Sequence, residues 1–161
     1  MGKIIAICGK ICSGKTYYAN RIKLKEGAII LSIDEVTFDL IKNEQDDFYD
    51  IFADRVKKYL RKKASELVNI GCNVILDWGF WSKIEREEIT NYFNKCGICV
   101  EWHYIDVEQS RWKKQIEERN QKIKEGNGGY NFYLDENLMK KMLSRFEELS
   151  VKDIDVWYIN N

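Results

Sequence analysis

The residues of this sequence that are best suited to chemistry lie in the glycine-rich segment between Gly9 and Thr16. Two glycines separated by four residues are followed directly by Lys15 and Thr16, and this spacing fits the phosphate-binding loop pattern G-x-x-x-x-G-K-[ST]. In such a loop, backbone N–H groups and the positive end of the next helix surround nucleotide phosphates. The lysine reaches the β- and γ-phosphates, and the threonine hydroxyl binds Mg²⁺.

The surroundings of the segment are those that a phosphate-binding loop requires. An apolar run over Lys3–Cys8 predicts a buried strand before it, and Lys15–Lys25 has the pattern of a helix after it. The alternative is a glycine-rich turn with an incidental Lys-Thr pair. We expect the nucleotide to be contacted by Gly9, Lys10, Ile11, Cys12, Ser13, Gly14, Lys15, Thr16 and Tyr17.

Two aspartates follow apolar runs and are candidates for a site near this loop. Asp34 comes after the run Ala28–Ile33, and Asp77 ends the run "VILD". Parallel strands present their carboxyl ends at one edge of a sheet, where open α/β folds bind ligands. The "VILD" run fits a Walker B strand, whose aspartate supports Mg²⁺. Either residue could instead be a helix N-cap or turn aspartate.

One arginine is placed unusually for a surface helix. Trp112, Ile116, Arg119 and Ile123 recur at i, i+4, i+7 and i+11, which puts them on one helix face. A guanidinium within an apolar stripe needs a partner, because burying it alone is costly. In one interpretation Arg119 forms a structural ion pair, or its side chain extends to solvent. In the functional interpretation it binds a phosphate of a ligand.

The elements that must position these residues alternate along the chain. Apolar runs predict strands, and 3.6-residue periodicity with Ser82 as a cap and Gly71 as a terminator predicts helices. Strands are expected at Lys3–Cys8, Ala28–Ile33, Asn73–Trp78, Ile98–Ile105 and Ile154–Ile159, and helices at Lys15–Lys25, Val36–Asn43, Asp47–Ile70, Lys83–Lys95, Val107–Lys124 and Asp135–Leu149. This alternation predicts an α/β fold with a five-stranded, mainly parallel sheet flanked by helices.

The composition restricts the class of protein. The 161 residues are expected to form a single domain, and 45% apolar residues suffice for a core. A net charge of +0 from 26 basic and 26 acidic residues argues against a dedicated nucleic-acid binder. No apolar stretch approaches the roughly 20 residues that cross a bilayer, so we expect a cytoplasmic protein without a membrane partner. The C-x-x-C of Cys96 and Cys99 lacks a second such pair, so we interpret both cysteines as small buried hydrophobes.

Several segments together resemble one family. They are "GKICSGKT", "LSIDEV", "VILDWGFWSKIERE", "YIDVEQSRWKKQIEERN" and "LMKKMLSRFEEL". They are similar to the small P-loop kinases labelled AAA_33, a group related to chloramphenicol phosphotransferase, polynucleotide 5′-kinase and zeta-toxin kinases. Their core is like that of adenylate and shikimate kinases. One departure is "FEEL", where relatives often have "FEPP".

The resemblance implies roles for the residues that match. Lys15 would be catalytic, Asp34 would be the general base on the acceptor side, and Asp77 with Thr16 would hold Mg²⁺. Arg119 would be a lid arginine that pairs with the transferred phosphate. Acceptor-side helices would span about 36–70 and a lid about 108–134, with the glycine-rich stretch 125–133 as its mobile part. ATP and Mg²⁺ are the implied cofactors.

The acceptor is the least determined part of the prediction. The segment 38–54 is acidic and aromatic, which suits a neutral or cationic small molecule better than a polynucleotide, unless it is only a solvated helix face. The residues concerned are Phe38, Asp39, Glu44, Asp46, Asp47, Phe48, Tyr49, Asp50, Phe52 and Asp54. The leading hypothesis is a kinase for a small-molecule hydroxyl, acting as a monomer or homodimer. The alternatives are a regulatory nucleotide-binding ATPase and a polynucleotide 5′-kinase.

Overall fold

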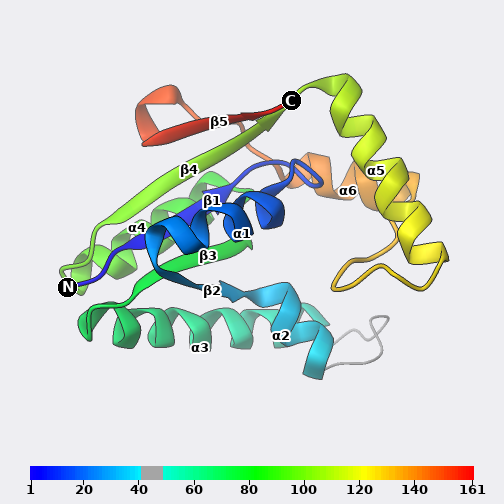
Figure 1. Cartoon of the computed structure of the whole chain (residues 1–161). Coiled ribbons are helices and arrows are strands. Elements are labelled where there is room, and N and C mark those ends of the chain that lie inside the picture. Colours follow the sequence, from blue (N-terminus) through cyan, green and yellow to red (C-terminus); the bar gives the residue numbers. More distant parts are fainter. Residues whose placement is uncertain (41–48) are drawn as a thin grey trace.

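The computed structural model describes residues 1–40 and 49–161, and its centre is one five-stranded sheet (Figure 1). All neighbouring strands pair in parallel, in the order β2-β3-β1-β4-β5. The strands are β1 (Ile4–Cys8), β2 (Ala28–Ser32), β3 (Asn73–Gly79), β4 (Val100–Val107) and β5 (Val156–Asn160). Parallel neighbours need crossover connections, which the helices between them supply. The predicted α/β fold with five parallel strands is confirmed.

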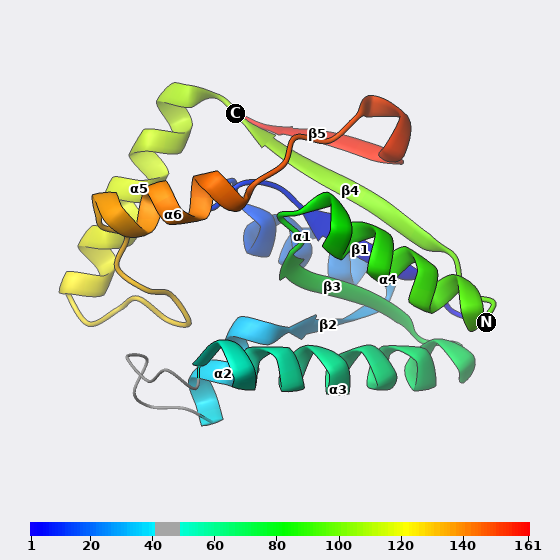
Figure 2. The same ribbon diagram turned by 180° about the vertical axis from the view of Figure 1, so that it is seen from behind.

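The helices divide between the two faces of the sheet and one of its ends. They are α1 (Lys15–Glu26), α2 (Ile33–Leu40), α3 (Tyr49–Asn69), α4 (Lys83–Lys95), α5 (Gln109–Lys124) and α6 (Glu136–Arg145). Helix α1 covers one face, and α3 and α4 cover the other (Figures 1 and 2). Helices α2, α5 and α6 lie near the end of the sheet where β1 stops (Figure 1). Within the described ranges, no helix is both long and apolar enough to span a bilayer.

The core forms because β1 is buried on both of its faces. Successive side chains of a strand point to opposite sides. Ile5 and Ile7 therefore pack toward Tyr18 and Ala19 of α1. The other side chains of β1 pack in a second cluster with residues of α3 and α4: Ile4, Ala6 and Cys8 with Ala64, Val68, Ile89 and Phe93. A strand covered in this way reads as a continuous apolar run, which is why the sequence identified it.

Helices α2 and α6 differ most from the sequence prediction. Helix α2 begins at Ile33, so Asp34 lies in its first turn, and the residues 41–43 of the predicted helix lie outside the described part of the chain. Helix α6 ends at Arg145, whereas the periodicity predicted a helix to Leu149. The reason is a tertiary contact: Phe146 adopts an extended conformation, and the backbone N–H of Glu147 donates to the Trp81 carbonyl at 2.8 Å.

The predicted helix boundary signals at Ser82 and Gly71 are present. Ser82 and Glu85 form a reciprocal capping box at the start of α4. Gly71 has a φ of 96° and donates to the Val68 carbonyl at 3.0 Å, which ends α3 with a glycine in the left-handed region. These local devices fix the two ends of β3 and thereby the position of Asp77.

The interpretation of Cys96 and Cys99 as buried hydrophobes was wrong. Both cysteines are exposed, and all five cysteines of the chain are free. The turn between α4 and β4 is anchored by Ile98, which is 1% exposed, so the two thiols on either side of it point outward.

Phe93 tests the core between α4 and the sheet. Its side chain is fully buried, so Phe93→Ala leaves a cavity and we expect the free energy of unfolding to fall by about 3–5 kcal/mol. Tyr59→Ala on α3 is the control, because that ring is exposed and its loss changes stability by about 0.5 kcal/mol or less. Urea unfolding followed by circular dichroism measures both. Equal losses would contradict this description of the core.

Candidate active site

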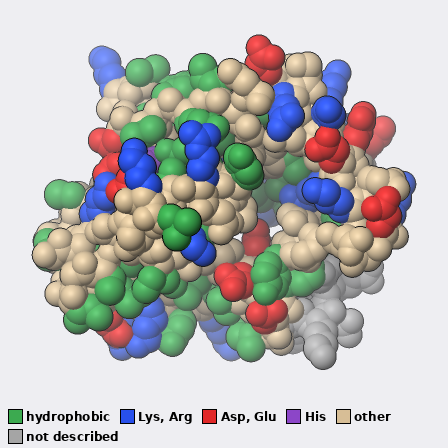
Figure 3. All heavy atoms as spheres, in the orientation of Figure 1, with side chains coloured by type: hydrophobic (Ala, Val, Ile, Leu, Met, Phe, Trp, Pro, Cys, Tyr) green, Lys and Arg blue, Asp and Glu red, His purple; other side chains and the backbone are tan. Residues whose placement is uncertain are grey.

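A pocket of about 990 Å³ lies at the carboxyl end of the sheet. Its walls come from the glycine-rich loop, the starts of α1 and α2, the end of β3, and the facing sides of α5 and α6. Figure 3 shows this hollow from outside, with acidic and basic side chains around its mouth. Ser32, two residues before Asp34, pairs with Asp77 across β2 and β3. The sheet register therefore brings the two predicted aspartates to one place.

The loop needs glycine at both of its motif positions. Gly14 has a φ of 98°, and a Cβ there would lie 2.4 Å from Nδ2 of Asn160. A Cβ on Gly9 would lie 2.6 Å from the Ile105 carbonyl oxygen. Both approaches are closer than a carbon side chain tolerates, so the loop can pack against β4 and β5 only with glycines. Cys12 also has a positive φ, of 57°.

Two side chains far away in sequence hold the loop in shape. Asn160, buried at the end of β5, donates from Nδ2 to the Ser13 carbonyl at 2.8 Å. Trp112 of α5 donates from Nε1 to the Ile11 carbonyl at 2.6 Å, and the Lys10 ammonium lies 4.6 Å from the centre of its ring. The sequence analysis assigned neither contact. Trp112 had been placed only in an apolar stripe, and nothing in the local sequence marked Asn160.

The predicted nucleotide-binding residues divide into two groups. The pocket is lined by Ile11, Cys12, Gly14, Lys15, Thr16 and Tyr17. Gly9, Lys10 and Ser13 do not line it. The Ser13 hydroxyl is buried and has no hydrogen-bond partner among the described residues, so the loop still has unmet hydrogen-bonding capacity. Gly14 caps α1 without a side-chain hydrogen bond, which leaves the first N–H groups of the helix available to an anion.

The Lys15 ammonium lies within the curve of the loop. It donates to the carbonyl oxygens of Gly9 at 3.0 Å and Lys10 at 2.9 Å. Burial lowers the pKa of Lys15, and the nearby Asp77 carboxylate opposes that effect. A lysine ammonium has three donor hydrogens, so one remains for an oxygen in the pocket. The arrangement suits a phosphate oxygen.

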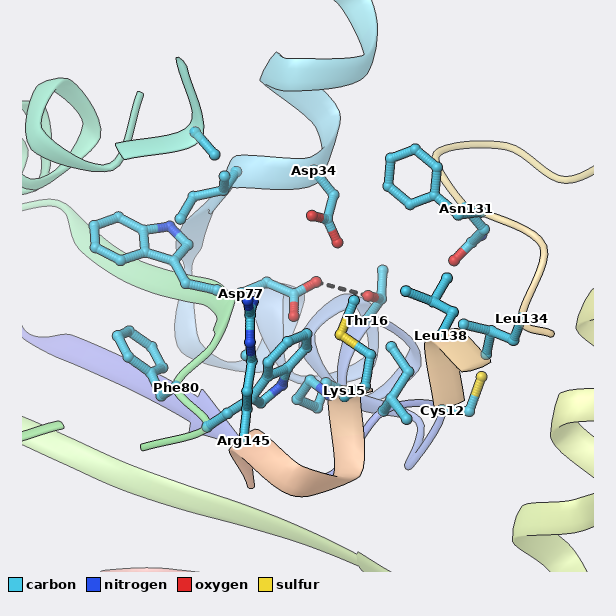
Figure 4. A pocket seen from close by; sticks show the side chains of 18 of the residues that line it. Cys12, Lys15, Thr16, Asp34, Asp77, Phe80, Asn131, Leu134, Leu138 and Arg145 are labelled. Atoms are coloured by element: carbon cyan, nitrogen blue, oxygen red, sulfur yellow. Dashed lines mark hydrogen bonds between the residues drawn. The ribbon is translucent and has the colours of Figure 1, made fainter. Parts of the chain in front are cut away.

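Thr16 and Asp77 form the pair of oxygens that a magnesium ion would need. The Thr16 hydroxyl donates to Oδ2 of Asp77 at 2.7 Å, and Asp77 is 7% exposed (Figure 4). Hydroxyl and carboxylate oxygens are hard ligands of the kind that Mg²⁺ binds, usually together with phosphate oxygens and water. In the parts of the chain that the structure describes, no group of three or more His, Cys, Asp or Glu side chains forms a metal site. The Thr16 and Asp77 oxygens fit a Mg²⁺ ion whose other ligands would be phosphate oxygens and water.

Asp34 points into the pocket near Asp77 and Thr16 (Figure 4). Asp34 is exposed toward the pocket, and partial desolvation by the pocket walls is the main cause that raises the pKa of its carboxyl. The negative charge of Asp77 raises the pKa further, while Lys15 and Arg119 act in the opposite direction. A carboxylate with a raised pKa holds a proton more strongly, which suits a base that must accept one.

Arg119 joins the far wall of the pocket to the loop. Its Nε donates to the Phe132 carbonyl at 3.1 Å, and one terminal nitrogen lies 3.5 Å from the Cys12 sulfur. No carboxylate within the described ranges forms an ion pair with it. The structure thus does not support a structural ion pair, one of the alternatives that the sequence left open, and the guanidinium charge remains available to an anion in the pocket.

The glycine-rich stretch after α5 is in contact with α2 across the mouth of the pocket. The ring of Phe38 lies 5.1 Å from that of Phe132 and 6.0 Å from that of Tyr130, measured between centroids. Asn120 fixes the other end of this stretch through two hydrogen bonds with the backbone of Leu134, both 2.8 Å long. The glycine-rich stretch predicted to be the lid and helix α2 on the predicted acceptor side are therefore in contact through aromatic rings.

The acidic segment expected near the acceptor is only partly described. Asp54 lines the pocket, and Asp39 lies outside it. Glu44, Asp46, Asp47 and Phe48 lie outside the described residues, as do the side chains of Tyr49 and Asp50. The pocket wall contains three basic residues that the sequence analysis missed: Lys57 of α3, Lys122 of α5 and Arg145 of α6.

Comparison with known proteins agrees with this geometry. The profile of a family described as AAA domain, AAA_33, matches residues 4–149. The chain belongs to this AAA family. The matched region extends from β1 to the residues just after α6, so it contains every pocket residue discussed above except Asn160 behind the loop. A search of curated proteins finds no match.

Solved structures with a similar fold include kinases. A sugar kinase from Janibacter sp. HTCC2649 has a TM-score of 0.61 at 13% identity, over 99% of this chain and 85% of that chain. Kti12 of Chaetomium thermophilum in complex with ADP-AlF3 has a TM-score of 0.66 at 13% identity, over 98% and 88%. A chain of the Pnkp1/Rnl/Hen1 RNA repair complex has a TM-score of 0.68 at 14% identity, over 89% and 43%. The AAA-family chain thus has a kinase-like P-loop fold.

A pair of glycine variants tests the packing of the loop. Gly14→Ala combines a positive φ with a clash against Asn160, and we expect it to lower the free energy of unfolding by about 2 kcal/mol or more. Gly126→Ala is the matched control, because Gly126 has a φ of 78° but no atom within 4 Å of its added Cβ; it should cost only about 1 kcal/mol. Urea unfolding measures both losses. A Gly14→Ala loss no larger than that of the control would contradict the close approach.

Proposed function

We propose that this AAA-family protein is a kinase that transfers the γ-phosphoryl group of ATP to a hydroxyl of a small molecule. The observation that carries the proposal is the position of the Asp34 carboxylate, which faces the Thr16–Asp77 pair and Lys15 in one pocket (Figure 4). A phosphate-binding loop alone would serve any nucleotide-binding protein. A second carboxylate beside it is what an attacking hydroxyl requires.

Asp34 would be the base of the reaction. It accepts the proton of the acceptor hydroxyl as the acceptor oxygen forms a bond to the γ-phosphorus. The bond between the γ-phosphorus and the oxygen bridging to the β-phosphate breaks, and that electron pair leaves with ADP. The raised pKa of Asp34 favours this proton transfer. The transferred group carries most of the negative charge, so the remaining catalytic work is positioning and charge stabilisation.

Lys15 and Arg119 would supply that charge stabilisation. Lys15 has one donor hydrogen beyond those bound to the loop carbonyls. Arg119 approaches from α5 on the other side of the loop and holds the Phe132 carbonyl and the Cys12 sulfur. Two cations from different elements can contact the phosphoryl group from different directions, which suits a group whose charge is spread over several oxygens.

Thr16 and Asp77 would hold Mg²⁺. The ion, when bound with ATP, would neutralise charge on the phosphate oxygens. In the structure the hydroxyl and the carboxylate are already hydrogen-bonded to each other, so both oxygens are oriented toward one position. Asp77 is also fixed by the pairing of β3 with β2.

The volume of the pocket and the net charge of the chain favour a small acceptor. Small-molecule pockets typically enclose about 300–1,000 Å³, and this pocket is of that order. The net charge of +0 lacks the basic excess that a polynucleotide substrate favours. The similar folds include both a sugar kinase and a chain of an RNA repair complex, so the class of acceptor must be tested directly.

Two variants separate nucleotide binding from transfer. Lys15→Ala should abolish turnover, and Asp34→Asn should lower acceptor-dependent ADP formation by about 10²–10⁴-fold while leaving the affinity for ATP unchanged. Lys25→Ala and Glu35→Gln are the matched controls, because both side chains are exposed and lie outside the pocket. Calorimetry with an ATP analogue and a coupled ADP assay measure the two properties. Equal loss of ATP binding in both variants would refute this division of roles.

The acceptor assay itself separates the alternatives. Nucleosides, sugars, amphenicols, aminoglycosides and short 5′-hydroxyl oligonucleotides are offered with Mg·ATP, and phosphorylated products are identified by mass. Acceleration by one small-molecule class supports the proposal. Acceleration by oligonucleotides alone would instead support a polynucleotide 5′-kinase. Tight ATP binding without any effect of an acceptor would favour a regulatory ATPase.

A further inference from the structure

One face of α6 forms part of the pocket wall and carries a basic residue. Leu138, Met142 and Arg145 recur at i, i+4 and i+7, and all three line the pocket. Lys140 and Lys141, on other faces of the same helix, are exposed and do not line it. Arg145 is therefore the one basic residue of α6 that is directed to the site.

Among the basic side chains that line the pocket, Arg145 and Lys122 differ from the others in their partners. Lys15 is bound to loop carbonyls, Lys57 forms a 2.8 Å ion pair with Glu85, and Arg119 donates to Phe132. Neither Arg145 nor Lys122 has a hydrogen bond or ion pair with any residue that the structure describes, but Lys122 lies in the last turn of α5, whereas Arg145 lies next to the segment that contacts Trp81. Figure 4 shows the Arg145 side chain extending from α6 toward Asp77, inside the pocket. Because the side chain is exposed to the pocket, a ligand can reach it.

The position of Arg145 is fixed by the segment that follows it. The N–H of Glu147 donates to the Trp81 carbonyl at 2.8 Å. Arg86 of α4 donates to the Glu147 carbonyl at 3.1 Å and to the Phe80 and Trp81 carbonyls at 3.0 Å each. The end of α6 is thus tied to the β3–α4 connection. These contacts fix the backbone from which the Arg145 side chain enters the pocket, so the guanidinium is presented from a defined place on the wall.

We infer that Arg145 binds an anionic group of the acceptor, so that the acceptor is a small hydroxyl compound that also carries a carboxylate or phosphate, such as a sugar acid. This inference rests on the function proposed above. A guanidinium matches the planar pair of oxygens of a carboxylate or the face of a phosphate and can bind either through two hydrogen bonds. The phosphates of ATP already have the loop N–H groups and Lys15. Arg145 comes from a different wall, beside Phe80 and Trp81.

The pocket is lined by several carboxylates, so an anionic acceptor needs a cation beside it. Arg145 extends toward Asp77 from the side of the pocket opposite Asp34 (Figure 4). From there it offsets the repulsion and orients the acceptor hydroxyl toward Asp34. The inference differs from the neutral or cationic acceptor expected from the acidic segment 38–54, of which Asp54 is the acidic residue seen to line the pocket within the described ranges.

Pairs of acceptors that differ by one anionic group test the inference. D-gluconate with D-sorbitol, D-glycerate with glycerol, and a 3′-nucleotide with its nucleoside are compared in the ADP assay. For at least one pair we expect kcat/KM to be about 10-fold or more higher for the anionic member. Arg145→Ala should remove this preference by raising KM for the anion while kcat changes little. Arg145→Lys should keep part of the preference, and Lys141→Ala, the control on the same helix, should keep all of it.

Three results would overturn the inference. The first is a preference for the neutral members in the wild type. The second is an equal loss for anionic and neutral acceptors in Arg145→Ala, which would assign the arginine to the transferred phosphoryl group. The third is weakened binding of ATP or Mg²⁺ in that variant, which would make Arg145 a partner of the nucleotide or of Asp77.

Binding measurements separate this inference from the proposed function. D-gluconate, D-glycerate and the 3′-nucleotide are titrated by calorimetry into the ADP-loaded wild type and Arg145→Ala. If no acceptor is phosphorylated but an anion binds the wild type and its affinity falls about 10-fold or more in the variant, the anion site stands and the kinase proposal fails. If no anion binds the wild type more tightly than it binds the variant, the anion site is wrong, whatever the outcome of the kinase assay.

Discussion

The burial of β1 at the centre of a parallel sheet is the constraint on which the pocket depends. With β3 on one side, β4 on the other and helices over both faces, this strand has no freedom to shift. The chain leaving it at Cys8 must turn within a space bounded by the ends of its neighbours. Gly9 and Gly14 allow that turn because no side chain would fit against Ile105 and Asn160. The shape of the phosphate-binding loop is therefore a consequence of how tightly the sheet is closed around it.

The ionisable groups of the pocket depend on one another. Burial lowers the pKa of Lys15, and the Asp77 carboxylate counteracts this. The same carboxylate raises the pKa of Asp34, whereas Lys15 and Arg119 lower it. A ligand that brings negative charge into the pocket raises the pKa of both Lys15 and Asp34, even where it touches neither side chain.

What the sequence could predict is what local spacing determines. The loop motif, the apolar strands and the cap at Ser82 are each encoded within about ten residues, and all of them are present. The hydrogen bond from Asn160 to Ser13 joins residues 147 positions apart, so no local sequence pattern could predict it. The end of α6 was misplaced for the same reason, since a contact with Trp81 stops the helix before its periodicity ends. Arg145, in contrast, was detectable, because it follows Leu138 and Met142 with the spacing that identified Arg119.

The contact between Phe38 and Phe132 links two parts of the site that come from distant segments. Phe38 lies one helical turn after Asp34 on α2, and the backbone carbonyl of Phe132 holds Arg119. Asp34 of α2 and Arg119 of α5 are therefore connected through the contact between the Phe38 and Phe132 rings. A displacement of the glycine-rich stretch that separates the two rings would also move the Phe132 carbonyl that positions Arg119. The placement of the basic side chain on α5 therefore depends on a ring contact made by the helix that carries the acidic one.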